Sequence, residues 1–323
     1  MGWLECRPIV WLFAVSGRYT MNDTFMKEKP IFPLLVSMAL PMVISMLVQA
    51  LYNVVDSIYV SQVSESAVTA LSLAFPIQNL LIGFAVGIGV GVNSLLSKSL
   101  GEKNQEAANR AAGNGIVLMA IAMVLFVLFG LFGVRPYFAI QSDNPETVEG
   151  GIVYTSICCV FSVGCFASIL GERLLQSTGR TVHTMITQSI GAIINIILDP
   201  IFIFVFDMGV AGAAIATVLS QAVSAVWILR FLTGRKTILR LKARNMLLQG
   251  KIILPCLALG ISSFVMVSTE SILSVSFTSS LSRYGGDVAV GAMTVLTSVN
   301  QLITMPLQGI CQGGQPLISY NYG

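Results

Sequence analysis

Long apolar stretches, separated by short polar connectors, dominate the pattern of hydrophobic and polar positions along this chain. A helix needs roughly 20 apolar residues to cross a bilayer, because its backbone polar groups must be satisfied within the segment. The pattern predicts eight such helices, at about 33–60, 67–97, 111–134, 151–175, 183–206, 209–232, 252–280 and 287–318. The runs are continuously apolar, without the alternation of membrane β-strands. We therefore predict an all-α membrane protein, a polytopic helical bundle of about eight transmembrane helices.

Composition strengthens this prediction. Of the 323 residues, 55% are hydrophobic and only 10% are charged, and the mean hydropathy is +0.82. A soluble domain carries about a quarter charged residues, so a soluble or disordered chain is excluded. We expect the lipid bilayer to surround most of the molecule.

The distribution of basic residues predicts the orientation of the bundle. With eight spans, all of the 18 Lys and Arg residues except Arg135 and Arg283 fall on one side of the membrane. Cytoplasmic loops carry the excess of Lys and Arg, so this side is predicted to be cytoplasmic. We expect a multi-pass protein of the inner (plasma) membrane with its N-terminus in the cytoplasm.

The pattern also predicts the domain boundaries. Residues 1–27 are expected to be an N-terminal extension outside the fold, with Met21 as the natural start. Residues 28–232 form a six-helix lobe, and the Arg- and Lys-rich stretch 233–251 is a cytoplasmic linker. Residues 252–323 are then the first two helices of a second lobe.

Internal similarity connects the two lobes. Leu40-Pro41 recurs as Leu254-Pro255 at an offset of 214, and Gly87 and Gly91 recur as Gly309 and Gly313 at an offset of 222. An even number of spans separates the copies, so both have the same orientation and are related by an axis along the membrane normal. Completing the second repeat would take four more helices. We therefore interpret the chain as a C-terminally truncated member of a twelve-helix, two-lobe architecture.

At this point the residues resemble a known family, multidrug and toxic compound extrusion (MATE), in its MepA/DinF-like bacterial branch. The motifs that carry the resemblance are Pro41 with Gln49, Tyr52-Asn53-Val54-Val55-Asp56, Lys98-Ser99-Leu100-Gly101-Glu102, Asn195-Ile196-Ile197-Leu198-Asp199-Pro200 and Gln312-Gly313-Gly314-Gln315-Pro316. It covers residues of about 28–323. The resemblance implies an exporter in which aspartates of the first lobe couple ion entry to drug release. One departure is Ser263, where the NorM-like branch is expected to carry an acid.

Three of the 15 acidic residues lie well inside predicted spans: Asp56, Asp199 and Glu270. A carboxylate in hydrocarbon costs at least about 2.5 kcal/mol, which makes each a candidate functional group. Gln49, Asn53 and Asp56 share one helix face, and so do Asn195 and Asp199. Pro200 frees a backbone carbonyl beside them. The alternative is that these groups only hydrogen-bond to neighbouring helices.

We therefore predict an ion- and substrate-binding site that holds a proton, or sodium at Asp56, Asp199 and Asn195. Its predicted residues are Asp56, Asp199, Asn195, Asn53, Gln49, Tyr52 and Glu270. Glu270 is the repeat mate of Asp56, and it either forms a second site between the lobes or reaches the membrane surface. Tyr52 offers a π-face to a cation.

Together these features predict a secondary multidrug antiporter that exports organic cations in exchange for protons or sodium by alternating access. We expect no enzyme activity, cofactor or nucleic-acid partner, since the chain has neither a phosphate-binding loop nor metal-ligand spacing. We expect a monomer. Two alternatives remain: a flippase for a lipid-linked oligosaccharide, which would need several buried Arg or Lys that the spans lack, and a non-transporting membrane fragment.

Overall fold

The computed structural model describes residues 30–63, 65–141, 144–234 and 243–323, so the predicted extension 1–27 lies outside the described residues. Within them, all regular structure is helical. The helices are α3 (Ile31–Ser61), α4 (Glu65–Gly101), α5 (Gln105–Leu128), the π-helix η1 (Phe129–Gly133), α6 (Val134–Gln141), α7 (Pro145–Val160), α8 (Val163–Ser177), α9 (Thr181–Pro200), the π-helix η2 (Ile201–Val205), α10 (Gly209–Leu232), the 3₁₀ helix η3 (Ala243–Met246) and α11 (Gly250–Tyr322). The all-α prediction is confirmed.

Most predicted spans coincide with these helices to within a few residues. The first predicted span corresponds to α3, the second to α4 and the sixth to α10. Asn104 and Asn144 begin α5 and α7, and each side chain accepts a backbone N–H of the first turn. Apolar length therefore located the helices, but α5 and α7 begin at their capping residues, about six residues before the predicted spans.

Two predicted spans differ in shape from a straight helix. The fourth, at 151–175, is broken into α7 and α8, which meet at an angle of 49°. The third continues past its predicted end through η1 and α6, so the apolar segment covers Gln105–Gln141. A π-turn inserts one extra residue into the helical ladder and lets the segment continue with a local distortion.

By length and apolarity, six helices in the described part of the chain can cross a membrane, or seven when α7 and α8 count as one span. Eight were predicted. The predicted eighth span at 287–318 is helical, but it belongs to α11, and several side chains there lie outside the described part.

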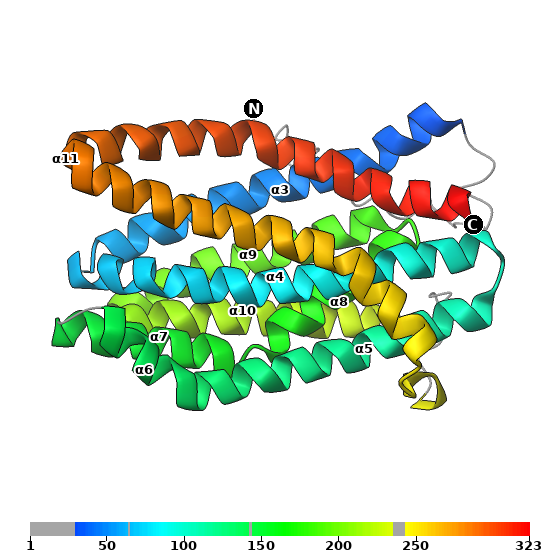
Figure 1. Cartoon of the computed structure of the whole chain (residues 1–323), viewed down its shortest axis with the longest axis horizontal. Helices are drawn as coiled ribbons and strands as arrows, with labels where there is room; N and C mark the ends of the chain where they lie inside the picture. The colour runs from blue at the N-terminus through cyan, green and yellow to red at the C-terminus, as the bar shows by residue number, and fades with distance from the viewer. Residues whose placement is uncertain (1–29, 64, 142–143, 235–242) are drawn as a thin grey trace, which may run out of the picture.

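Helix α11 doubles back on itself, as Figure 1 shows. Gly91 of α4 touches the backbone of Cys256, and Gly101 of α4 touches the backbone of Tyr320. A straight helix between those two α11 residues would be about 96 Å long, whereas the two glycines are about 15 Å apart along α4. The two arms of α11 therefore lie side by side on the bundle and occupy the places of the predicted seventh and eighth spans.

The arms of α11 pack on α4 and α3, and α3 packs in turn on α9. The remaining helices form the interior of the first lobe, with α4 against α5, α7 and α8, and α10 against α8 and α9. A large apolar core lies between them, and Cys256 of α11 joins it. The linker before α11 is anchored where the Gln249 backbone N–H donates to Asn114 Oδ1 of α5 at 3.0 Å.

The glycines of the internal repeat occupy matching positions between the lobes. A Cβ on Gly87 or Gly91 of α4 would lie against the backbone of Gly260 or Cys256 in the first arm of α11. In the second arm, Gly309 and Gly313 lie in the same way against the backbone of Val43 and Ala39 in α3. If a two-fold axis relates the two repeats, the contact between α4 and the first arm of α11 implies an equivalent contact between the second arm and α3, as observed. The ridge of small residues in α4 therefore packs between the lobes.

The two ends of the bundle differ in charge. The turn between α4 and α5 and the turn between α8 and α9 lie at one end, with Lys98, Lys103 and Arg180. We call this the basic end. The opposite end carries the turns after α3, α6 and η2, with the exposed carboxylates of Glu146 and Glu149.

Candidate functional site

A cluster of polar side chains lies between α3, α7, α9 and α10, towards the end opposite the basic end. The carboxyl groups of Asp56 and Asp199 meet within hydrogen-bonding reach. Asp199 is fully buried, and Asp56 Oδ1 is buried with no hydrogen-bond partner in the described part of the chain. An ionised carboxylate can only accept hydrogen bonds, so a bond between these two groups requires a proton.

Asn195 fixes the position of Asp199 from one turn earlier on α9. Oriented so that both ends of the amide find partners, Asn195 donates from Nδ2 to Asp199 Oδ2 at 2.8 Å and accepts from the Thr217 backbone N–H at 3.3 Å. Asn195 itself is 1% exposed. Because both the nitrogen and the oxygen of this buried amide are hydrogen-bonded, to groups on α9 and α10, the amide holds the Asp199 carboxylate in one rotamer.

Tyr52 and Tyr154 complete the cluster. The Tyr52 hydroxyl is hydrogen-bonded to the Thr217 side chain and lies near both aspartates. From α7, the buried Tyr154 hydroxyl lies near Asp56 and Tyr52, and it accepts a 2.9 Å hydrogen bond from Gln78 Nε2 of α4. Five helices thus contribute to one buried group of hydroxyl, amide and carboxyl side chains, which we call the aspartate site.

Pro200 ends α9 directly after Asp199. Without an N–H, Pro200 cannot bond to the Ile196 carbonyl, and the chain continues as the π-helix η2. The irregular turn therefore begins directly beside Asp199. Irregular backbone at membrane depth is tolerated where it lines a polar cavity.

Of the predicted site residues, Asp56, Asp199, Asn195 and Tyr52 come together here. Gln49, Asn53 and Glu270 are exposed in the structure, and none of the contacts described above involves them. Three members were missed from the sequence: Gln78, Tyr154 and Thr217. Gln78 carried a usable signal, since it is an amide inside an apolar span, but a tyrosine or threonine in a span is too common to single out.

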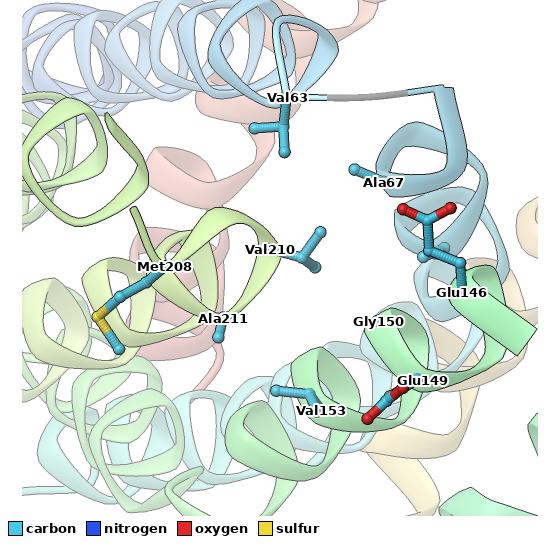
Figure 2. A pocket seen from close by; sticks show the side chains of 10 residues that line it. Val63, Ala67, Glu146, Glu149, Gly150, Val153, Met208, Val210 and Ala211 are labelled. Carbon is cyan, nitrogen blue, oxygen red and sulfur yellow. The ribbon is translucent and has the colours of Figure 1, made fainter. Parts of the chain in front are cut away.

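A hollow of about 320 Å³ opens at the same end of the bundle (Figure 2). Its wall is mainly apolar, with Ala67, Val153 and Val210, and Glu146 and Glu149 stand on it. No residue of the aspartate site lines this hollow. Within the described residues, no three His, Cys, Asp or Glu side chains gather as a metal site would require.

One sequence expectation about charge is wrong. The predicted spans were expected to lack buried Arg and Lys. Arg173 is only 7% exposed within α8, and its Nη1 donates to Gln176 Oε1 at 3.0 Å. Glu172 instead accepts a hydrogen bond from Gln188, because successive helical residues point about 100° apart.

Comparisons with known proteins agree with this architecture. The model of the MatE family matches residues 41–201 and 262–323, which is more than half of the chain. The chain belongs to the MatE family. This is the family that the sequence motifs resemble, and the match includes Asp56, Asn195 and Asp199. The chain is therefore a multi-pass membrane protein of the MATE fold.

Individual MATE relatives are also similar. The multidrug export protein MepA of Staphylococcus saprophyticus is 23% identical over 299 residues, which cover 92% of this chain and 66% of the relative. A MOP superfamily transporter from Pyrococcus furiosus has a solved structure with a TM-score of 0.88 and 27% identity, covering 94% of this chain and 68% of that one. The chain thus spans 66% of the length of the first of these relatives.

A structure described as the outward-facing conformation of a multidrug resistance MATE family transporter also superposes, with a TM-score of 0.88 and 27% identity. It covers 94% of this chain and 68% of its own. In the present structure the two lobes meet near the basic end, where Gln315 of α11 donates to Ser94 Oγ of α4 at 3.0 Å. The two lobes are therefore in contact near the basic end.

Proposed function

We propose that this protein is a secondary active multidrug exporter, which exchanges organic cations for protons or sodium by alternating access. The observation that carries the proposal is the Asp56–Asp199 pair inside one lobe, in which Asp199 is fully buried and Asp56 Oδ1 is buried without a partner among the described residues. Relatives described as multidrug export proteins support the activity. The proposal places the basic end in the cytoplasm, in keeping with the excess of Lys and Arg in cytoplasmic loops.

The chemistry follows from one negative site and two kinds of positive ligand. When both aspartates are ionised, their charge and the face of Tyr52 attract a cation. When a proton or sodium ion enters from outside, it neutralises the pair, and the organic cation loses its counter-charge and leaves. Because the ion and the cation compete for the same carboxylates, entry of one drives exit of the other.

The first prediction tests the pair directly. Asp56→Asn and Asp199→Asn should each abolish efflux of a cationic dye, because an amide keeps the size of the side chain but cannot carry the negative charge. Efflux is measured as the loss of dye fluorescence from preloaded cells that express the protein. Glu149→Gln removes an exposed carboxylate from the same end of the bundle and should leave efflux unchanged. Normal efflux in both asparagine variants would rule out the aspartate site.

The coupling ion is identified with purified protein in vesicles. A pH gradient and a sodium gradient are imposed separately, and dye movement is followed in each. Movement with the pH gradient alone identifies protons, and movement with the sodium gradient alone identifies sodium. If neither gradient moves the dye and the protein is folded, secondary antiport is wrong.

A further inference from the structure

A second polar cluster lies in the same lobe, nearer the basic end. It consists of Ser45 on α3, Glu172 on α8 and Gln188 on α9. Gln188 Nε2 donates to Glu172 Oε2 at 2.7 Å, and the Ser45 hydroxyl donates to Gln188 Oε1. Ser45 is fully buried. The three side chains form one directed chain of hydrogen bonds that ends on the Glu172 carboxyl group.

Glu172 forms no ion pair with any described residue, although it lies in a segment that crosses the membrane. Arg173, the charged neighbour, acts on Glu172 electrostatically but does not pair with it: its Cγ lies against Gly89 of α4, and its guanidinium bonds to Gln176. Cys165 is the other titratable group that faces Glu172 from α8. From α9 the carboxyl group is bonded to Gln188, which in turn is bonded to Ser45 of α3, and neither of these side chains titrates.

The second cluster is in register with the aspartate site. Ser45 and Gln188 pair across α3 and α9, and Asp56 and Asp199 pair across the same two helices. Both steps are eleven residues, about three helical turns or 16 Å, which returns to the same helix face. Tyr52 also lies on this face of α3. The two carboxyl sites therefore lie along one seam between parallel helices, about three turns apart.

A carboxylate inside a membrane protein without a cationic partner is unfavourable, and such groups mark ion pathways. A neutral amide donor orients Glu172 but does not cancel its charge. A proton does cancel it, and the carboxyl group lies five residues from the end of α8 at the basic end. Of the two ends of the bundle, the basic end is therefore the nearer one to Glu172.

We propose that Glu172 is a second proton-binding carboxyl group of the lobe, held in position by Gln188, and that it receives the proton released by the aspartate site. The proposal rests on the proposed proton-coupled export. An O–H bond on an aspartate breaks and one on Glu172 forms, with water along the seam carrying the proton between them. Glu172 then releases the proton to water at the basic end and returns to the carboxylate.

The experiment compares net transport with exchange in vesicles that contain the purified protein. Net efflux driven by a pH gradient requires a proton to leave at the basic end, whereas exchange of labelled for unlabelled dye does not. Glu172→Gln should lower net efflux at least about tenfold, since positioned proton transfer contributes at least that much. Dye exchange and dye affinity should be retained. Glu172→Asp keeps the carboxyl group and should recover part of net efflux.

Glu102→Gln is the matched control, because Glu102 is an exposed glutamate at the same end that pairs with Lys98 at 3.7 Å. It should behave as the wild type.

Unchanged net efflux in Glu172→Gln would overturn the proposal, and so would an equal loss of net efflux and exchange, which indicates a structural role. Dye movement in the wild type with sodium alone would overturn the role of Glu172 and leave cation export standing. If Asp199→Asn loses efflux while Glu172→Gln keeps normal net efflux, the role of Glu172 is rejected and the role of the aspartate site stands.

Discussion

At the scale of residues, the aspartate site depends on hydrogen bonds that cross helices. Thr217 illustrates this, because its hydroxyl is bonded to Tyr52 and lies 3.4 Å from the Asn195 amide group, while its backbone N–H supports the same amide. One threonine therefore connects α10 to both α3 and α9. The local sequence around Thr217 does not indicate that it connects these helices.

Thr217→Val should weaken binding of a cationic dye by about twofold to tenfold, the effect expected for loss of a neutral hydrogen bond. Valine keeps the shape of the side chain but leaves Tyr52 and Asn195 without the hydroxyl. Binding is measured by dye fluorescence with purified protein. Thr233→Val on the same helix is the control, because that exposed hydroxyl bonds only to carbonyl groups of its own helix. Equal affinities in the two variants would contradict the assigned contact.

At the scale of elements, the contact between α4 and the first arm of α11 is set by glycines. A Cβ on Gly91 would lie 2.0 Å from the Cys256 carbonyl oxygen, while one on Gly83, about two turns away, would lie at an ordinary 3.4 Å from Val267. The helices thus converge towards the basic end. A residue with any side chain at Gly91 has to push the backbones apart.

Gly91→Ala should therefore abolish or strongly reduce dye efflux, since the lobes could no longer close at the basic end. Dye binding should persist, because the aspartate site lies nearer the other end of the bundle. Gly83→Ala is the matched control in the same ridge and should retain efflux. Both variants are compared by efflux rate at equal protein level. Full efflux in Gly91→Ala would show that close contact at this glycine is not required.

At the scale of the whole molecule, the two charged ends predict how the bundle lies in the membrane. Glu102 is exposed at the basic end, and Glu146 is exposed at the opposite end. Glu102→Cys should react with a membrane-impermeant thiol reagent only after the cells are permeabilised, whereas Glu146→Cys should react in intact cells. Labelling is read on a gel after Cys311, the exposed native cysteine among the described ones, is changed to serine. The reverse pattern would contradict the proposed orientation.

Much of the fold could be predicted from sequence, because the bilayer fixes the length and the apolar character of a spanning helix, and both can be read directly from the sequence. Apolar length located α3, α4 and α10, and the repeat of Gly87 and Gly91 as Gly309 and Gly313 indicated two copies in the same orientation. The break between α7 and α8 was missed, because no proline marks it. Helix α11 doubles back between the predicted seventh and eighth spans, which correspond to its two arms.

The candidate site was only partly predictable. Asp56, Asp199 and Asn195 stood out because charged and amide groups are costly in a membrane, and that cost depends on residue type alone. Which of them meet, and with which hydroxyl groups, depends on how five helices pack. Gln49 and Asn53 share a predicted face with Asp56 but are exposed, so periodicity narrowed the candidates without selecting among them.

The sequence by itself therefore determined that the chain spans a membrane, where its helices run, that it contains a repeat and that it belongs to a family of transporters. These follow from composition and from motifs that are local in the chain. Only the tertiary structure decided that Arg173 is buried and bonded to Gln176, that Thr217 and Tyr154 join the aspartates, and that a second carboxyl group lies in register with them. The reason is that each of these facts depends on contacts between residues far apart in sequence, which no single helix encodes.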